Sequence, residues 1–213
     1  LNDLLMEISK ICLIEQERMK HKQRKGDCFN VFNTLGLRSN EVRLHSAFLA
    51  ELLNPDGNHG LKDAMLKEFL AAIGLKRDYI SNCNTNIVER STGGRIDIIL
   101  EDGEYAIIIE NKIYAIDQYH QLLRYNNYGK QRFPKGFKLI YLTLDGHEAS
   151  KDSLGDNEID YHCISYKGHI LNWLSKCVML AYDKPLVRET ISQYITLIKQ
   201  ITGQDMNKDS SDK

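Results

Sequence analysis

Apolar side chains recur at helical spacing in the first third of the chain. Residues 2–25 carry hydrophobic positions three and four apart and close in a basic run, which is typical of one long amphipathic helix. Residues 40–53 repeat this spacing after a Ser-Asn capping pair and stop at the turn 54–57, and residues 61–73 form a third such stretch. The pattern therefore predicts three helices before any strand.

From residue 86 onward the spacing changes to short runs rich in β-branched residues. Such runs at 87–90, 95–100 and 105–109 predict three strands. The pair Asp102 and Gly103 supplies the turn of a hairpin between the last two strands.

The rest of the chain alternates between the two patterns. The predicted elements are a helix at 117–131 with Asp117 as N-cap, strands at 137–144 and 160–165, and helices at 167–181 and 186–202.

This order of elements predicts the fold class α/β (α+β). We expect a mixed central sheet of about four to five strands flanked by helices, with extra helices at both termini. The predicted division is an N-terminal helix at 1–26, a main domain at 27–203 and a disordered polar tail at 204–213.

Composition limits the class of protein. The 213 residues are 42% hydrophobic and 27% charged, which is ordinary for a soluble domain, and no apolar run approaches the ~20 residues that span a bilayer. No signal-peptide pattern stands at the amino end, and the five cysteines are scattered, so we expect a cytoplasmic, reducing location. The net charge of −1 means that a nucleic-acid partner needs a local basic surface.

The predicted hairpin can be tested by its register. A two-residue loop at Asp102-Gly103 places Asp97 opposite Ile108, and because side chains alternate, Glu110 and Lys112 then lie on the same face as Asp97. A four-residue loop is expected to keep that register, whereas an odd-length loop would send Asp97 to the opposite face.

Two carboxylates and an ammonium are thus expected on an otherwise apolar strand pair. Buried charges are costly unless they are paired or bind a metal. Carboxylate and carbonyl oxygens suit Mg²⁺, which can polarise a phosphoryl oxygen and lower the pKa of a bound water, while Lys112 could position or deprotonate that water. The alternative is a structural Asp-Lys or Glu-Lys pair at the strand ends, and register and composition favour neither.

Several motifs resemble a known family. Residues 94–99 and 107–112 resemble the D…E-x-K core of the PD-(D/E)XK nuclease superfamily, although Ile stands where the proline of the Pro-Asp pair is usual. Residues 117–125 resemble the Q-x-x-x-Y helix motif of its RecB-like and λ-exonuclease-like branches. Residues 41–46 and 52–60 resemble a bacterial subgroup, and the whole resemblance covers residues 30–170.

The resemblance implies a restriction-endonuclease-like core with a bound cation. Asp97, Glu110 and the backbone carbonyl of Asn111 would bind Mg²⁺, for which Mn²⁺ would substitute. Glu41 matches the acidic residue that often completes the metal shell, and Lys112 would serve the attacking water.

Further candidates surround this core. Gln121, expected to be catalytic, shares a helix face with Tyr125, and their amide and phenol could hold a phosphate or the lysine; an ordinary solvated face is the alternative. Glu41 and His45 lie four residues apart on one helix face. The alternative to a functional role is that Glu41 caps the helix or pairs with His45. The residues expected to bind substrate are His45, Arg95, Gln118, Arg124, Tyr125 and Lys130.

The charge pattern supports a nucleic-acid partner. Residues 118–144 contain no acid but five Lys or Arg, which gives a local positive surface for phosphate. We therefore expect a Mg²⁺-dependent nuclease acting on DNA, in restriction, repair or phage defence by family analogy. The alternatives are a non-catalytic nucleic-acid-binding module on the same fold, or a domain of a larger effector whose terminal helices form a homo-oligomer.

Overall fold

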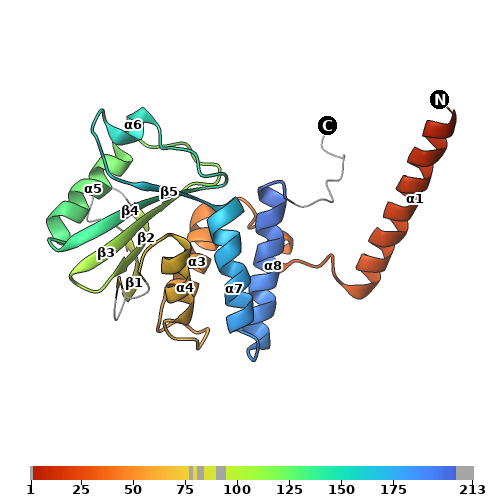
Figure 1. Cartoon of the computed structure of the whole chain (residues 1–213), viewed down its shortest axis with the longest axis horizontal. Coiled ribbons are helices and arrows are strands. Elements are labelled where there is room, and N and C mark those ends of the chain that lie inside the picture. Colours follow the sequence, from red (N-terminus) through yellow and green to blue (C-terminus); the bar gives the residue numbers. More distant parts are fainter. Residues whose placement is uncertain (1, 77–78, 81–83, 90–94, 205–213) are drawn as a thin grey trace.

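A five-stranded mixed sheet forms the centre of the protein (Figure 1). The computed structural model describes residues 2–76, 79–80, 84–89 and 95–204, so the predicted tail from 205 onward lies outside the described residues. The strand order is β1-β2-β3-β4-β5, and the number of strands agrees with the four to five that were predicted. The strands are β1 (Asn84–Glu89), β2 (Arg95–Glu101), β3 (Tyr105–Asn111), β4 (Gly136–Thr143) and β5 (His162–Ser165).

The first three strands run antiparallel and the last three run parallel. A parallel pair needs a crossover connection, and helix α5 (Gln121–Arg132) supplies it between β3 and β4. The carboxyl end of β3 therefore lies next to the start of α5.

Helices cover both faces of this sheet, and two of the predicted helices begin with a π-helical segment. The helix expected at 40–53 is η1 followed by α3, and the helix expected at 167–181 is η2 followed by α7. The helices are α1 (Asn2–Lys25), α2 (Val31–Thr34), η1 (Glu41–Ser46), α3 (Ala47–Leu53), α4 (Ala64–Ala72), α6 (Lys151–Leu154), η2 (Tyr166–Ile170), α7 (Leu171–Leu180) and α8 (Pro185–Ile201).

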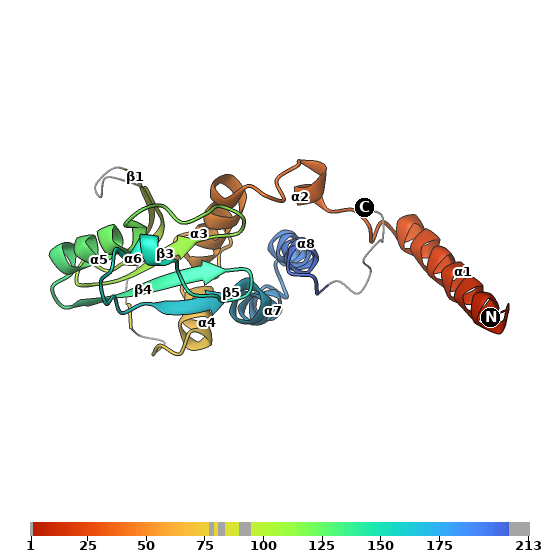
Figure 2. The ribbon, with the colours of Figure 1, turned by 90° about the horizontal axis from the view of Figure 1, so that it is seen from above.

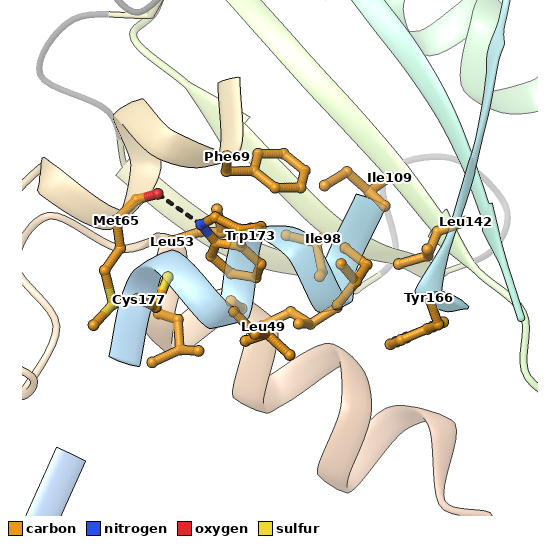
Figure 3. Packing of buried hydrophobic residues seen from close by; sticks show 14 of the residues in the cluster. Leu49, Leu53, Met65, Phe69, Ile98, Ile109, Leu142, Tyr166, Trp173 and Cys177 are labelled. Atoms are coloured by element: carbon orange, nitrogen blue, oxygen red, sulfur yellow. Dashed lines mark hydrogen bonds between the residues drawn. The ribbon is translucent and has the colours of Figure 1, made fainter. Parts of the chain in front are cut away.

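The larger hydrophobic core lies between one face of the sheet and helices α3, α4, α7 and α8. Figure 3 shows Trp173 at its centre, with the ring of Phe69 packed edge-on at 5.2 Å. The indole N–H of Trp173 donates to the carbonyl of Met65 at 2.8 Å, so its polar atom is satisfied in the core. Ile98 and Ile109 bring the middle strands into this cluster.

The second core lies on the opposite face, under α5. Leu122 and Tyr125 of α5 pack there against Ile108 of β3. Gly129 allows the close approach, because a Cβ at that position would lie 2.6 Å from the ring of Phe137. Residues at the start of α5 are thereby held over the end of β3.

Helix α1 extends away from the rest of the chain in both views (Figures 1 and 2). Its apolar side chains, among them Leu4, Ile8 and Ile11, are exposed. None of the described helices combines the length and hydropathy needed to cross a membrane. Homo-oligomerisation and the domain boundaries stay predictions.

The hairpin between β2 and β3 has a longer loop than the two-residue turn. Glu101 pairs with Ala106, so four residues lie between the last paired positions. The carboxylate of Asp102 accepts hydrogen bonds from the backbone of Glu104 and Tyr105, and Gly103 adopts a positive φ of 90°. The predicted pairing of residue 97 with residue 108 is therefore wrong by two positions, while the even loop length keeps the predicted face.

Strand β2 also contains a β-bulge at Asp97. Ile96 pairs with Val88 and Ile99 with residue 86, so Asp97 and Ile98 lie opposite a single residue of β1. A bulge bends its strand and redirects a side chain, which simple alternation along the strand does not predict.

Candidate active site

Two carboxylates meet where β2 and β3 separate. Asp97 lies at the bulge and Glu110 near the end of β3, and their side chains are buried, with 8% and 2% of the residue exposed. Asp97 Oδ2 accepts a hydrogen bond from the backbone N–H of Asn111 at 3.0 Å. In a regular antiparallel pair, a backbone carbonyl of β2 would accept from such an N–H group instead.

The two oxygens of Glu110 have different surroundings. Oε1 lies 2.9 Å from the ammonium of Lys112 and accepts a 2.6 Å hydrogen bond from the amide of Gln121. Oε2 is buried and has no hydrogen-bond partner. A buried oxygen without a partner is costly, so this atom is the position in the site where a ligand gains most.

Burial raises the pKa of both carboxyl groups. It raises the pKa of Asp97, and it raises the pKa of Glu110 to about 8, where the charge of Asp97 adds to the effect and Lys112 opposes it. Lys112 contacts Glu110 at 2.9 Å, and Asp97 lies close enough to both for their charges to act on one another.

The side chain of Asn111 points to the opposite face of the sheet from Glu110. Its amide donates to Ser46 Oγ at 3.0 Å, and the hydroxyl of Tyr166 donates to its carbonyl oxygen at 2.9 Å. The end of β3 is thereby tied to η1 and η2. Ser46 lies in the motif of residues 41–46, but no sequence pattern assigned it this contact, and Tyr166 lies in no motif; both are distant from Asn111 in sequence.

Helix α5 supplies the second polar layer above Glu110. Gln121 is the first residue of α5, and its amide also donates to the hydroxyl of Tyr125 at 3.2 Å. That hydroxyl donates in turn to the backbone carbonyl of Arg95 in β2. Gln121 and Tyr125 are both buried, so this helix face is not the solvated one of the alternative interpretation, and it links Glu110 of β3 to the backbone of β2. The expected hold on a phosphate or on Lys112 stays a prediction.

The predicted start of this helix is corrected. Asp117 is not its N-cap, because α5 begins at Gln121 after His120 in a left-handed conformation. The carboxylate of Asp117 instead accepts hydrogen bonds from the hydroxyl of Tyr141 at 2.8 Å and the backbone N–H of Ser150 at 2.7 Å. Asp117 therefore fastens the segment before α5 to its neighbours.

A comparison with protein-family models agrees with this geometry. Residues 29–196 match the model described as the PD-(D/E)XK nuclease superfamily. The chain belongs to this superfamily. Searches of curated proteins and of solved structures gave no significant match. The predicted mixed α+β, restriction-endonuclease-like fold is confirmed, and the matched region continues beyond residue 170 through α7 and most of α8.

This PD-(D/E)XK site has the oxygen atoms that a hard divalent cation prefers. Glu110 Oε2 has no hydrogen-bond partner, and Asp97 Oδ2 bonds to the backbone of Asn111, the residue whose carbonyl was expected as a ligand. Within the described ranges, no three His, Cys, Asp or Glu side chains are grouped closely enough to hold a metal alone. A cation here would therefore depend on two carboxylates, a carbonyl and water.

Glu41 holds the segment that follows β3. Its Oε1 accepts hydrogen bonds from the backbone N–H groups of Ile113, Tyr114 and Ala115 at 2.6–2.8 Å. The carboxylate is near enough to Asp97 to raise its pKa. Glu41 was expected to be a metal ligand, and no sequence pattern indicated this anchoring contact.

The expectation that His45 binds substrate is corrected. The side chain is fully buried, with Nδ1 2.8 Å from the hydroxyl of Tyr194 and Nε2 3.0 Å from the carbonyl of Arg38. Both ring nitrogens are engaged within the protein, so none is left for a substrate.

The predicted basic contacts fall into two groups. Arg95 lies near Asp97, whose pKa its charge lowers, whereas the guanidinium of Arg124 bonds to exposed Gln118 at 3.3 Å. Lys130 is exposed in the last turn of α5, roughly 13 Å along the helix axis from its first residue.

The segment between α5 and β4, which is part of the basic run 118–144, lies at the opposite end of β3 from the carboxylates. Lys135 forms an ion pair of 2.5 Å with Glu104, at the start of β3. Part of the expected positive surface is therefore neutralised within the protein.

Proposed function

We propose that this chain hydrolyses phosphodiester bonds of nucleic acid with a bound divalent cation, Mg²⁺ or Mn²⁺. Membership of the superfamily supports nuclease activity in general. The observation that carries the proposal is the environment of Glu110. One oxygen is held by Lys112 and Gln121, and the other is buried with no partner, as a metal ligand would be before the metal binds.

The proposed ligands are Asp97, Glu110 and the carbonyl of Asn111, together with water; the expectation that Glu41 completes the shell stays a prediction, because its Oε1 already accepts three backbone N–H groups. When bound, the cation would polarise a phosphoryl oxygen and lower the pKa of a water. It would also relieve the repulsion between the two buried carboxylates.

Lys112 is proposed to orient the attacking water or the phosphate. Its ammonium donates to Glu110 at 2.9 Å and to the carbonyl of Ile116 at 3.4 Å. An ammonium has three N–H groups, so one remains for the reacting atoms. Gln121 keeps Glu110 in the orientation that directs Oε2 away from Lys112.

The proposed substrate is DNA. This choice rests on the resemblance of the Gln121–Tyr125 motif to the RecB-like and λ-exonuclease-like branches. Arg95 and Arg124 would neutralise phosphates beside the site, with Lys130 contacting DNA further along α5. The cytoplasmic location and a role in restriction, repair or phage defence stay predictions.

Cleavage assays test the proposal directly. Labelled single-stranded and duplex DNA and RNA are incubated with Mg²⁺, Mn²⁺ or EDTA, and we expect DNA cleavage with either cation and none with EDTA. Replacing Lys112 with Ala should slow cleavage by about 10²–10⁴-fold. The control variant Lys67→Ala, which changes an exposed side chain of α4, should cleave normally. Binding without cleavage under all conditions would support the non-catalytic module instead, and full activity of Lys112→Ala would refute the catalytic role.

A further inference from the structure

The segment from residue 113 to residue 120, here called the post-β3 loop, is irregular but firmly anchored. It has neither helical nor strand structure. Glu41 accepts hydrogen bonds from the backbone N–H groups of residues 113–115, and the carboxylate of Asp117 accepts hydrogen bonds from Tyr141 and Ser150, as described above. The first half of the loop is therefore fixed on two neighbouring elements.

The second half is fixed around Tyr119. The backbone carbonyl of Tyr119 accepts a 2.5 Å hydrogen bond from the guanidinium of Arg124. The backbone N–H of His120 donates to the carbonyl of Asp152 at 2.7 Å. The main chain on both sides of the Tyr119 side chain is thus held in place.

The ring of Tyr119 has one covered face. It stacks on the imidazole of His120 with 3.7 Å between ring centroids and 23° between planes, and 70% of the residue is exposed. His120 adopts a positive φ of 54°, and its imidazole lies where a Cβ on Gly155 would come within 2.5 Å of it. A side chain with positive φ is unfavourable and persists only where the surroundings require it. Here the strained His120 supports an aromatic ring whose other face is open to solvent.

The backbone next to Tyr119 is linked to Glu110 through the side chain of Gln121. The backbone N–H of Gln118 donates to the amide oxygen of Gln121 at 3.3 Å, and the amide nitrogen of Gln121 donates to Glu110 at 2.6 Å. One residue separates Tyr119 from Gln121, so their Cα atoms lie within about 7 Å of each other. A nucleotide next to a phosphate at the carboxylates would reach the ring.

We propose that Tyr119, supported by His120, is a stacking platform for a nucleobase beside the scissile phosphate. The platform rests on the proposed nuclease function and specifies its substrate class. Bases of a continuous duplex are already stacked on each other, whereas an unpaired base presents a free face to an aromatic ring. The preferred substrate is therefore single-stranded nucleic acid or an unpaired end.

Binding measurements without cleavage test the platform. Fluorescence anisotropy in EDTA compares a single-stranded oligonucleotide with its duplex. We expect Tyr119→Ala to weaken single-strand binding by about 5- to 100-fold, in line with the loss of one stacked base, and to leave duplex binding unchanged. Tyr119→Trp should bind like wild type, and so should the matched control Tyr182→Ala, which removes a tyrosine that is 75% exposed after α7.

A scan with single abasic sites identifies the partner of the ring. At one position the missing base should weaken binding by wild type but cause no further loss in Tyr119→Ala, because both changes remove the same contact. Equal single-strand binding by wild type and Tyr119→Ala, or equal loss on single strand and duplex, would overturn the platform. So would additive losses at every abasic position.

Cleavage with Mg²⁺ is measured separately on the same oligonucleotides, so the two proposals can fail independently. Tyr119-dependent single-strand binding with no cleavage under any cation would support the platform and refute the nuclease. Cleavage of duplex and single strand at rates independent of Tyr119 would support the nuclease and refute the platform.

Discussion

The amide nitrogen of Gln121 lies 2.6 Å from Glu110 Oε1, so the first residue of α5 holds the central carboxylate of the site. Lys112 contacts the same oxygen at 2.9 Å. Two donors on one oxygen determine the orientation of the carboxylate and leave the other oxygen for a ligand. The crossover helix between β3 and β4 is therefore part of the candidate active site.

Gln121→Leu should slow cleavage with little change in fold. Leucine has a similar size but cannot donate to Glu110, and a hydrogen bond to a charged group contributes about 1.5–3 kcal/mol, which corresponds to roughly 10- to 100-fold in rate. Single-turnover cleavage measures the effect, and Gln131→Leu, exposed on the same helix, is the control. A wild-type rate for Gln121→Leu would contradict the positioning role.

A divalent cation should raise the melting temperature of the protein. At about 100 times its Kd, a bound ligand adds about 2.7 kcal/mol, which corresponds to roughly 5–10 °C for a chain of this size. Differential scanning fluorimetry with Mg²⁺ or Mn²⁺ measures the shift, which should disappear in Asp97→Asn and Glu110→Gln. The exposed variant Glu148→Gln should keep it. An undiminished shift in both site variants would place the cation elsewhere.

Glu41→Ala should destabilise the protein by about 1–3 kcal/mol, because three backbone N–H groups lose their acceptor. Glu41→Gln keeps a carbonyl oxygen for these donors and should lose less than half as much. Urea unfolding measures both, with exposed Glu158→Ala within about 0.5 kcal/mol of wild type.

The same pair of variants separates anchoring from metal binding at this position. If Glu41 also completes the metal shell, Glu41→Gln should reduce the thermal shift caused by Mg²⁺ despite its near-normal stability. Unfolding free energies of Glu41→Ala equal to wild type would exclude the anchoring role.

His45 should make the protein less stable at mildly acidic pH. Burial lowers the pKa of His45, so below pH 6.5 the unfolded chain binds a proton that the native protein does not. Stability therefore falls as pH drops below 6.5, by at most about 1.4 kcal/mol per pH unit, until the native pKa is reached.

Urea unfolding of wild type and His45→Gln between pH 7 and pH 5 measures this contribution. The raised pKa of Glu110 gives a slope of the opposite sign in both proteins, so the difference between them isolates His45. Wild type should lose more stability than His45→Gln over this range, while His147→Gln, which changes an exposed histidine, should follow wild type. Parallel curves for wild type and His45→Gln would refute the prediction.

Local pattern was sufficient to predict most of the sheet and to select the candidate site residues. Strands β2 to β4 and the long helices α1 and α8 carry strong periodicity, and the residue types at 97, 110 and 112 are typical of a metal-assisted hydrolase. An even-length loop kept these residues on one face even though the predicted register was wrong by two positions.

Contacts between distant segments decided the rest. Whether His45 faces substrate or core depends on Tyr194, 149 residues away, and the anchoring of Asn111 depends on Tyr166, 55 residues away. The bulge at Asp97 depends on pairing with β1. The backbone N–H groups that donate to Glu41 lie more than 70 residues further along the chain. The sequence alone therefore determined which residue types are present and how each element is patterned. Only the tertiary structure decided which polar groups are buried, satisfied or free, because hydrogen bonding and desolvation depend on neighbours that the fold brings together.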